Sequence, residues 1–429
     1  MVGAILGTTL IDLSELLDSP VERTSQILTT RAIGFLVGSL LSSSVLYRYI
    51  HGKICMVYTL VLGGVVNALI PSLGTLAGAH MCLFFAGMSA GILEVGGNVW
   101  LEQLWLESVA PVFQMYHLSF AFGSFVAPVI TEPYLSTKKE TPAVSGTEGD
   151  ISDTWIAIPY AIFGTFYSLV GFFMLFLFCI DPSDLHGNQP APTGETTNIE
   201  KTKQRAQFEW RIAVHLVLYI FVQVSVEHTI GQMLNVYVLS HVTLGFDKWS
   251  ASYLFATFWT LYTAGRVVAM VLSFKVRSFT LILFMHSLCI IGTILIVTLG
   301  TTVGSSLWVS IGIMGFGLSP LYASAMSWAV RYTRLQYIHM TFVLVASCMG
   351  QMLPPLTVAL WVKATPSIFV WVIFGWMVLH TINLFLMHKV TKGQVDIYEY
   401  ESASTEPTMG VATSAAGSTS ESNPDEASA

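Results

Sequence analysis

Long apolar segments recur along the whole chain, and they constrain its fold more than any other feature of the sequence. A helix needs about 20 apolar residues to cross the hydrocarbon core of a bilayer. Eleven segments reach this length, with short polar turns between most of them. Such a chain is predicted to fold as an all-α polytopic membrane protein. The segments are approximately 26–47, 54–73, 76–100, 112–135, 155–180, 210–240, 250–274, 279–299, 303–330, 337–362 and 366–388.

The composition agrees with a membrane location. Hydrophobic residues make up 53% of the 429 residues and charged residues 10%, whereas a soluble domain carries about 25% charged residues. The formal net charge of −7 comes largely from tails and loops, so we expect no nucleic-acid partner. The five cysteines lie far apart within apolar stretches, which predicts small hydrophobic side chains rather than disulfides or a metal site.

The first residues form a shorter apolar run, MVGAILGTTLIDLSELL, which leads into the acidic residues Asp12, Glu15 and Asp18. It lacks the basic segment that opens a cleavable signal peptide. Because it is too short to span a bilayer, we expect it to be the outer half of a first helix whose beginning is absent from this chain. The complete set is then twelve helices with the first one truncated.

Two polar interruptions are longer than ordinary turns. The segments 136–153 and 181–209 have no apolar period and contain many Thr, Pro and charged residues. The second one separates six spans from six. The sequence therefore predicts a helical bundle at 1–180, a cytoplasmic linker at 181–209, a second bundle at 210–390 and a disordered cytoplasmic tail at 391–429, which is rich in Ser, Thr and Glu.

The basic residues indicate the orientation of the spans. With the amino end inside, the cytoplasmic loops hold twelve basic residues and the outer loops five, in agreement with the positive-inside rule. This predicts a multi-pass protein of the plasma membrane with both termini in the cytoplasm, and we expect it to be monomeric. The cytoplasmic set is Arg48, Lys53, Lys201, Lys203, Arg205, Arg211, Lys275, Arg277, Arg331, Arg334, Lys389 and Lys392, and the outer set is Arg23, Lys138, Lys139, Lys248 and Lys363.

Two short internal sequence repeats indicate that the two halves of the chain are related. Arg31 in the second span corresponds to Arg266 in the eighth, and a Gly followed five residues later by Pro recurs in the fifth and eleventh spans. Gly and Pro in a membrane helix weaken its hydrogen-bond ladder and allow bending. Paired six-helix bundles are typical of the major facilitator fold. We expect these six residues to act in helix packing or gating: Arg31, Arg266, Gly123, Pro128, Gly350 and Pro355.

An acidic residue, Glu94, lies in the middle of the fourth span, within GMSAGILEVGGNVW. An ionised group at a helix centre costs about 2.5–3.5 kcal/mol on insertion scales, so it needs a partner or a water-filled cavity. Asn98 lies one turn further on the same helix face. We interpret Glu94 and Asn98 as a site for a coupling ion, Na⁺ or H⁺, with carbonyls exposed at Gly96 and Gly97 as further ligands for Na⁺. The alternative is a protonated glutamic acid that bonds to another helix as structural glue.

The seventh span carries a high density of polar groups. Gln223 and Glu227 lie four residues apart, as do His228 and Gln232. Sugar hydroxyls that lose water must be paired again, and aromatic faces can stack on the C–H surface of a sugar. The alternative is inter-helix bonding or a kink in a gating helix. The substrate-binding candidates are Gln223, Glu227, Gln232 and Asn235, the stacking rings Trp259 and Trp328, and His117, which would relay protons to Glu94 or be a neutral buried imidazole bonded to a carbonyl.

Several of these segments resemble the sodium-dependent glucose transporter group of the major facilitator superfamily. They are GILEVGGNVW in the fourth span, the run from Gln114-Met-Tyr-His117 to Pro128, Phe258-Trp259 with Ala264-Gly265-Arg266, and GFGLSPLYASAMSW in the tenth span. The chain is also similar, more distantly, to bacterial fucose–proton symporters, whose fourth helix carries an acid and an Asn at this spacing. The acid of their first helix would fall near Val2 or Gly3, where this chain has none.

The resemblance implies ion-coupled uptake of a sugar, with Glu94 and Asn98 matching the acid and amide of the fourth helix and Glu227 matching an acid of the seventh. We therefore expect a secondary active transporter of a hexose that works by alternating access and is coupled to Na⁺ or H⁺. The sequence shows no phosphate-binding loop and no metal or catalytic cluster, so we expect no cofactor and no enzyme activity. The alternatives are a membrane scaffold or receptor, and a facilitator of another small polar solute.

Overall fold

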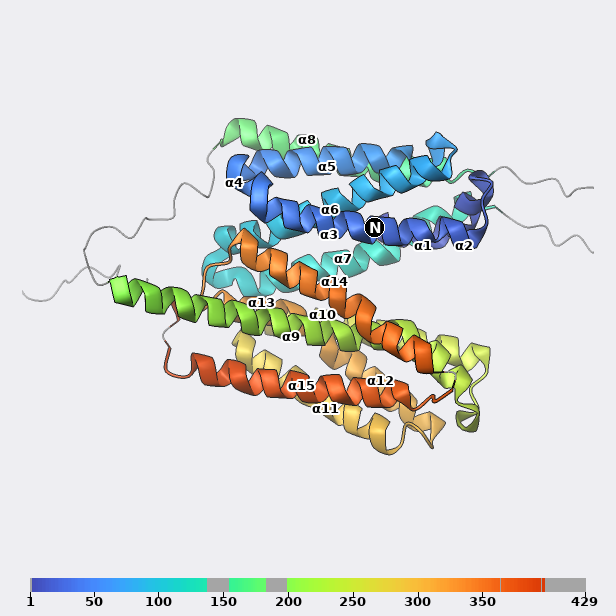
Figure 1. Cartoon of the computed structure of the whole chain (residues 1–429), viewed down its shortest axis with the longest axis vertical. Coiled ribbons are helices and arrows are strands. Elements are labelled where there is room, and N and C mark those ends of the chain that lie inside the picture. The colour runs from blue at the N-terminus through green and yellow to red at the C-terminus, as the bar shows by residue number, and fades with distance from the viewer. Residues whose placement is uncertain (1, 137–153, 183–198, 363, 395, 398–429) are drawn as a thin grey trace, which may run out of the picture.

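The helices of the chain form two groups that lie side by side (Figure 1). The computed structural model describes residues 2–136, 154–182, 199–362, 364–394 and 396–397. The first group consists of α1 (Val2–Leu16), α2 (Val21–Thr24), α3 (Gln26–Leu41), a π-helical turn at Ser42–Leu46, α4 (Tyr47–Tyr49), α5 (Gly52–Leu69), α6 (Leu76–Trp105), α7 (Val109–Thr131) and α8 (Ala157–Ile180). The second group consists of α9 (Ile199–Ser240), α10 (Lys248–Leu272), α11 (Ser278–Thr298), α12 (Gly304–Leu318), α13 (Leu321–Ala329), α14 (Tyr337–Trp361) and α15 (Ile368–Thr391).

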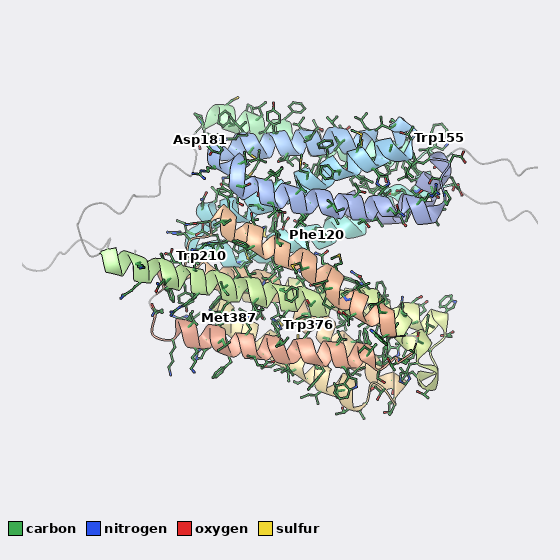
Figure 2. The ribbon with its side chains drawn as sticks, viewed as in Figure 1. Phe120, Trp155, Asp181, Trp210, Trp376 and Met387 are labelled. Atoms are coloured by element: carbon green, nitrogen blue, oxygen red, sulfur yellow. The ribbon has the colours of Figure 1, made fainter. Side chains whose placement is uncertain are left out.

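The surface of both groups is apolar, as a bilayer requires. Ten helices of the described chain are long and apolar enough to cross a membrane. On α8, the rings of Phe172, Phe173 and Phe176 are each more than half exposed. Phe120 of α7, labelled in Figure 2, is 69% exposed. The chain is therefore a multi-pass membrane protein built of two six-helix bundles, and the predicted fold class is confirmed.

The first helix and the linker differ in length from ordinary spans and loops. α1 has 15 residues, fewer than a full span. α9 begins at Ile199, so the last residues of the predicted linker 181–209 are helical. The ion pair between Arg205 Nε and Glu209 Oε1, at 2.9 Å, stabilises this polar extension through an i,i+4 contact that an apolar pattern does not reveal. The rest of the linker, 183–198, and the tail from residue 398 lie outside the described residues.

The tenth span, expected to be one helix over 303–330, is broken at Ser319 and Pro320 into α12 and α13. Proline has no N–H and its ring clashes with the carbonyl four residues before it, here that of Phe316. That carbonyl is directed at Gly265 of α10, where a Cβ would overlap it. The break therefore needs the glycine beside Arg266.

The helices α3 and α6 pack with their backbones in direct contact. A Cβ at Gly34 or Gly38 of α3 would overlap the carbonyls of Phe84 and Met88, and Gly87 and Gly91 of α6 meet α3 in the same way. We call these four glycines the glycine seam. Spacing by four residues places each pair on one helix face, which explains the small residues that precede Glu94.

One end of the molecule, here called the basic face, holds α4, the start of α9 and the segment 330–336 between α13 and α14. It lies at the left in Figure 1. It corresponds to the side predicted to be cytoplasmic. α14 lies close to the first bundle at this end and slopes away from it toward the opposite face (Figure 1). The two bundles therefore approach each other most closely toward the basic face.

Candidate functional site

Glu94 lies on α6, and both of its carboxylate oxygens accept hydrogen bonds. The Tyr116 hydroxyl of α7 donates to Oε2 at 2.8 Å, and Asn98 Nδ2 donates to Oε1 at 3.3 Å. Asn98 Nδ2 also donates to the Glu94 carbonyl at 2.8 Å. The structure thus brings Glu94 and Asn98 together and adds Tyr116, which the sequence shows only as part of the run Gln114-Met-Tyr-His117.

The expected carbonyl ligands at Gly96 and Gly97 are not exposed. α6 is continuous from Leu76 to Trp105, so these carbonyls belong to the hydrogen-bond ladder of the helix. Gly96 instead makes room for Tyr47, whose hydroxyl donates to the Ile92 carbonyl at 3.1 Å. The prediction of extra backbone ligands is wrong because two adjacent glycines did not unwind a helix that is packed on both sides.

Gln223 and Glu227 of α9 form the i,i+4 pair that their spacing predicts. Gln223 Nε2 donates to Glu227 Oε2 at 2.8 Å and to the Leu318 carbonyl at 3.4 Å. Gln232 is exposed, lies 3.3 Å from His228 Nδ1 and donates to the Gln351 carbonyl of α14 at 3.4 Å. The half-buried Asn235 lies further along α9. The polar groups of α9 therefore have two kinds of partner: Gln223 bonds Glu227 of the same helix, and Gln232 bonds the neighbouring α14.

Three buried amide side chains near the acids share one orientation. Asn98 and Gln223 direct their nitrogens at Glu94 and Glu227, and Gln114 Nε2 donates to the Pro320 carbonyl at 3.2 Å and to Ser324 Oγ at 2.9 Å. Carbonyl and carboxylate oxygens accept only, so the nitrogens must face them. The amide oxygens Asn98 Oδ1, Gln114 Oε1 and Gln223 Oε1 are buried and have no partner among the described residues. They are suited to a ligand that supplies hydrogen-bond donors or positive charge.

The break between α12 and α13 is bonded by side chains from three helices. The carbonyls of Leu318, Ser319 and Pro320 accept bonds from Gln223 of α9, Arg266 of α10 and Gln114 of α7, respectively. Interrupted helices in membrane proteins are tolerated where such side chains satisfy the freed backbone groups. The break therefore joins both bundles at the level of the acids.

Arg266 is 6% exposed, and its guanidinium makes four hydrogen bonds. Nη1 donates to the His117 carbonyl at 2.7 Å, Nη2 to the Tyr262 hydroxyl at 2.8 Å and the Ser319 carbonyl at 3.2 Å, and Nε to Ser319 Oγ at 3.3 Å. Tyr262 also interacts with Glu227. Arg266 thus connects the second bundle to α7 of the first, through bonds that an isolated sequence motif does not show.

Arg31 has a different environment from its counterpart Arg266. Its side chain is partly buried on α3, and Nε has no hydrogen-bond partner among the described residues. Tyr167 of α8 interacts electrostatically with both Arg31 and Glu94, so the three residues belong to one polar group. Arg31 and Arg266 therefore lie in corresponding spans of the two halves, α3 and α10, but they do not make equivalent contacts.

The proton relay, one of the two alternatives for His117, is not present in this conformation, because the residue that bonds Glu94 is its neighbour Tyr116. The His117 ring meets the ring of Tyr322 from α13 edge to face, with 4.7 Å between centroids. Tyr322 interacts electrostatically with both Glu94 and Glu227. Tyr322 therefore lies near the acids of both bundles, and only tertiary packing reveals it.

The remaining predicted site residues pack within the helices. The Trp259 ring lies over Gly231, and Trp328 is 1% exposed in the core against Tyr332, so Trp328 offers no free ring face for stacking in this conformation. Gly350 faces the backbone of α9 at Phe221 and Ser225. α14 continues through Pro354 and Pro355, and α7 contains Gly123, which is buried, and Pro128.

A set of contacts joins the two bundles at the basic face, and we call it the basic-face gate. The rings of Tyr47 and Tyr337 stack with centroids 4.3 Å apart. Thr341 Oγ1 of α14 lies 2.9 Å from both the Ser39 carbonyl and Ser43 Oγ. Arg334 Nη1 lies 3.3 Å from Oε1 of Glu102, which is 1% exposed. The bundles are thus closed together between this face and the level of Glu94.

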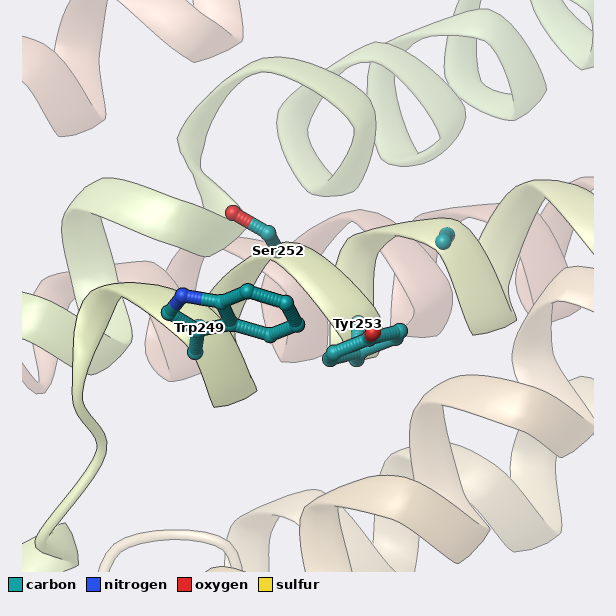
Figure 3. Close-up of a pocket in the computed structure, with 4 residues that line it drawn as sticks. Trp249, Ser252 and Tyr253 are labelled. Carbon is teal, nitrogen blue, oxygen red and sulfur yellow. The ribbon is translucent and has the colours of Figure 1, made fainter.

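A hollow of about 470 Å³ lies near the amino-terminal end of α10 and is lined by Trp249, Ser252, Tyr253 and Ala256 (Figure 3). Tyr253 precedes Arg266 by 13 residues, about 20 Å along a helix, so the hollow is separate from the acids. Among the described residues, no group of three His, Cys, Asp or Glu side chains could hold a metal ion. The polar layer around Glu94 and Glu227 therefore remains the candidate functional site.

Comparisons with known proteins agree with this fold. A model of the Major Facilitator Superfamily matches residues 1–355. Sodium-dependent glucose transporter 1A of Mus musculus is 27% identical over 380 residues, which are 84% of this chain and 86% of that protein. Sodium-dependent glucose transporter 1 of Homo sapiens is 25% identical over 382 residues, 83% of this chain and 70% of that one. The crystal structure of the transporter FucP in the outward conformation superposes with a TM-score of 0.66 at 13% identity, covering 90% of this chain and 96% of FucP.

Proposed function

Because the chain belongs to the Major Facilitator Superfamily, we propose that it is a secondary active transporter that moves a hexose such as glucose by alternating access, coupled to Na⁺ or H⁺. The observation that carries the proposal is the carboxylate of Glu94, held by Tyr116 and Asn98 at the level where the two bundles meet. Ionisable groups kept within a membrane protein mark ion or substrate pathways. The names of the 25–27% identical relatives support glucose as the first substrate to test.

The amide oxygens of Gln114 and Gln223 support a polyol substrate. Each oxygen is an acceptor whose own nitrogen is already bonded to the protein. Sugar hydroxyls are donors, so they can satisfy acceptors that would otherwise stay unpaired at a cost of about 1–3 kcal/mol each. We assign recognition of the sugar to Gln114 and Gln223 together with Glu227, and Asn98 to the ion site beside Glu94. His117 and Tyr322 form the neighbouring aromatic wall.

Coupling rests on the charge of Glu94. A proton or a cation neutralises the carboxylate, and that favours the loaded state in a medium of low polarity. The ion and the sugar then stabilise the same conformation, so each ligand raises the affinity of the protein for the other. That change in affinity is the coupling free energy. Oxygen atoms from Glu94 and Asn98 are the hard ligands that Na⁺ would use, whereas a proton needs only the carboxylate.

The conformation described here is closed at the basic face. In our proposal this face is cytoplasmic, both termini are cytoplasmic, and the protein works as a monomer in the plasma membrane. The gate residues Tyr47, Thr341 and Arg334 would separate when the site opens to the cytoplasm. A membrane scaffold, and a facilitator of another small polar solute, are the competing functions.

Uptake of labelled glucose into proteoliposomes tests the proposal. We expect accumulation above equilibrium under an inward Na⁺ or proton gradient, and its loss when an ionophore collapses that gradient. Exchange of glucose without accumulation under either gradient would identify a facilitator. Absence of both exchange and accumulation for a panel of monosaccharides would support the scaffold.

A further inference from the structure

The first residues after α15 fold back onto the basic-face segment between α13 and α14. Gly393 has a φ of +81°, a left-handed conformation that glycine adopts without strain, and it reverses the chain after Thr391. Asp396 Oδ2 then lies 3.1 Å from Arg331 Nη1, and the Ile397 N–H donates to the Arg331 carbonyl at 2.9 Å. We call Gly393, Asp396 and Ile397 the carboxyl-terminal clamp.

The segment held by the clamp also carries the cation of the basic-face gate. Arg334 lies three residues after Arg331 and reaches across to Glu102 on α6 of the first bundle. Between these two arginines, the Tyr332 carbonyl accepts a bond from Arg205 Nη2 of α9 at 3.5 Å. The segment is therefore held by the clamp and by α9 while Arg334 contacts the other bundle.

The clamp contacts are partly shielded from water. The side chains of Arg331 and Asp396 are 31% and 14% exposed. A fully exposed ion pair contributes little because water and salt screen it. A partly buried pair that is reinforced by a main-chain bond orients its segment more strongly, although it remains weak enough to break during a transport cycle.

We propose that the carboxyl-terminal clamp stabilises the conformation closed at the basic face, by fixing the segment from which Arg334 reaches Glu102. Release of Asp396 frees Arg331 and loosens the segment, and the bundles then separate at this face more often. The clamp is thus a control point outside the polar layer. It acts on the equilibrium between conformations and not on the binding of substrate.

The distance between two spin labels on opposite bundles tests this proposal. Labels at Tyr49→Cys on α4 and Phe274→Cys after α10, both on exposed side chains, report the opening of the basic face. The five native cysteines are replaced by alanine, and electron–electron double resonance is measured on the full-length protein. We expect Asp396→Ala, and separately a chain ending at Lys392, to raise the long-distance fraction about threefold, the scale of a weak ion pair.

Three controls isolate the clamp. Asp396→Glu keeps the charge, a chain ending at Ile397 keeps the clamp without the rest of the tail, and Asp181→Asn removes the pairing with Lys53, 3.2 Å away in the first bundle. We expect all three to give the distances of the parent. The proposal is overturned if Asp396→Ala also matches the parent, or if ending the chain at Ile397 opens the face as much as ending it at Lys392. The measurement needs no substrate, so its outcome is independent of the proposed sugar.

Discussion

At the scale of single residues, Glu94 is distinguished by having a donor on each carboxylate oxygen. Tyr116 and Asn98 stabilise the charged form without neutralising it, since both are uncharged. The group therefore stays available to a proton or a cation. An acid bonded to an arginine would already be neutralised by its partner.

The substitution Glu94→Gln keeps the shape of the side chain and removes its charge. We expect exchange of sugar down its own gradient to survive, and accumulation to fall to the level of the equilibrated control. Proteoliposome uptake and counterflow measure the two quantities. Glu132→Gln, at an exposed acid near the end of α7, serves as the matched control and should behave like the parent. If Glu94→Gln still concentrates sugar, the acid is structural.

Tyr116→Phe removes the donor to Glu94 Oε2 and leaves the ring in place. A hydrogen bond to a charged group contributes about 1.5–3 kcal/mol, and here it stabilises the empty carboxylate. Its loss should favour the neutralised form, so the concentration of coupling ion at half-maximal transport should fall about tenfold. Transport measured against Na⁺ concentration and against pH shows which ion shifts. An unchanged or higher half-maximal concentration for both ions would contradict this role.

At the scale of helices, the break at Ser319 and Pro320 depends on a glycine from another span. A Cβ at Gly265 would overlap the Phe316 carbonyl, while a Cβ at Gly375 of α15 would meet nothing within 4 Å. We expect Gly265→Ala to lower the free energy of unfolding by about 1–3 kcal/mol, the usual result of overpacking. Gly375→Ala should be neutral or slightly stabilising. Thermal unfolding in detergent compares the two, and equal melting temperatures would mean that the break adapts easily.

The helices also show which parts of the site could be predicted. The pairs Glu94–Asn98 and Gln223–Glu227 follow from their spacing because both partners lie on one helix. Tyr116 and Tyr322 come from other helices, and their contacts depend on how α7 and α13 pack. The break does not follow from the hydropathy pattern although Pro320 is visible in the sequence, because the residues around this proline are apolar.

At the scale of the whole molecule, the twelve-helix arrangement and the relation between its halves follow from periodic hydropathy and two short internal sequence repeats. The conformation closed at the basic face does not follow from the sequence, because the gate consists of long-range contacts such as that between Thr341 and Ser43. These contacts connect residues 298 positions apart. A local pattern can indicate that two bundles exist, but not which of their ends touch.

Locking the gate should stop the transport cycle. Thr341 Oγ1 and Ser43 Oγ are 2.9 Å apart, so Ser43→Cys with Thr341→Cys, in a background without native cysteines, places two thiols within bonding reach. Oxidation should reduce uptake more than about tenfold, and a reductant should restore it. Each single-cysteine variant should be insensitive to the oxidant. Full uptake by a protein shown to be cross-linked would contradict the movement of the basic face.

The glycine seam gives the first bundle a mechanical property. Where α3 and α6 touch backbone to backbone, no side chains remain between them to compress or to change rotamer, so the pair is stiff. α3 carries the Ser39 carbonyl of the gate, and α6 carries Glu94. A displacement of Glu94 therefore moves α3 and α6 together as a rigid pair, and it is transmitted directly to the gate. The bending that transport requires must then occur elsewhere, at the π-helical turn Ser42–Leu46 and at the break before α13.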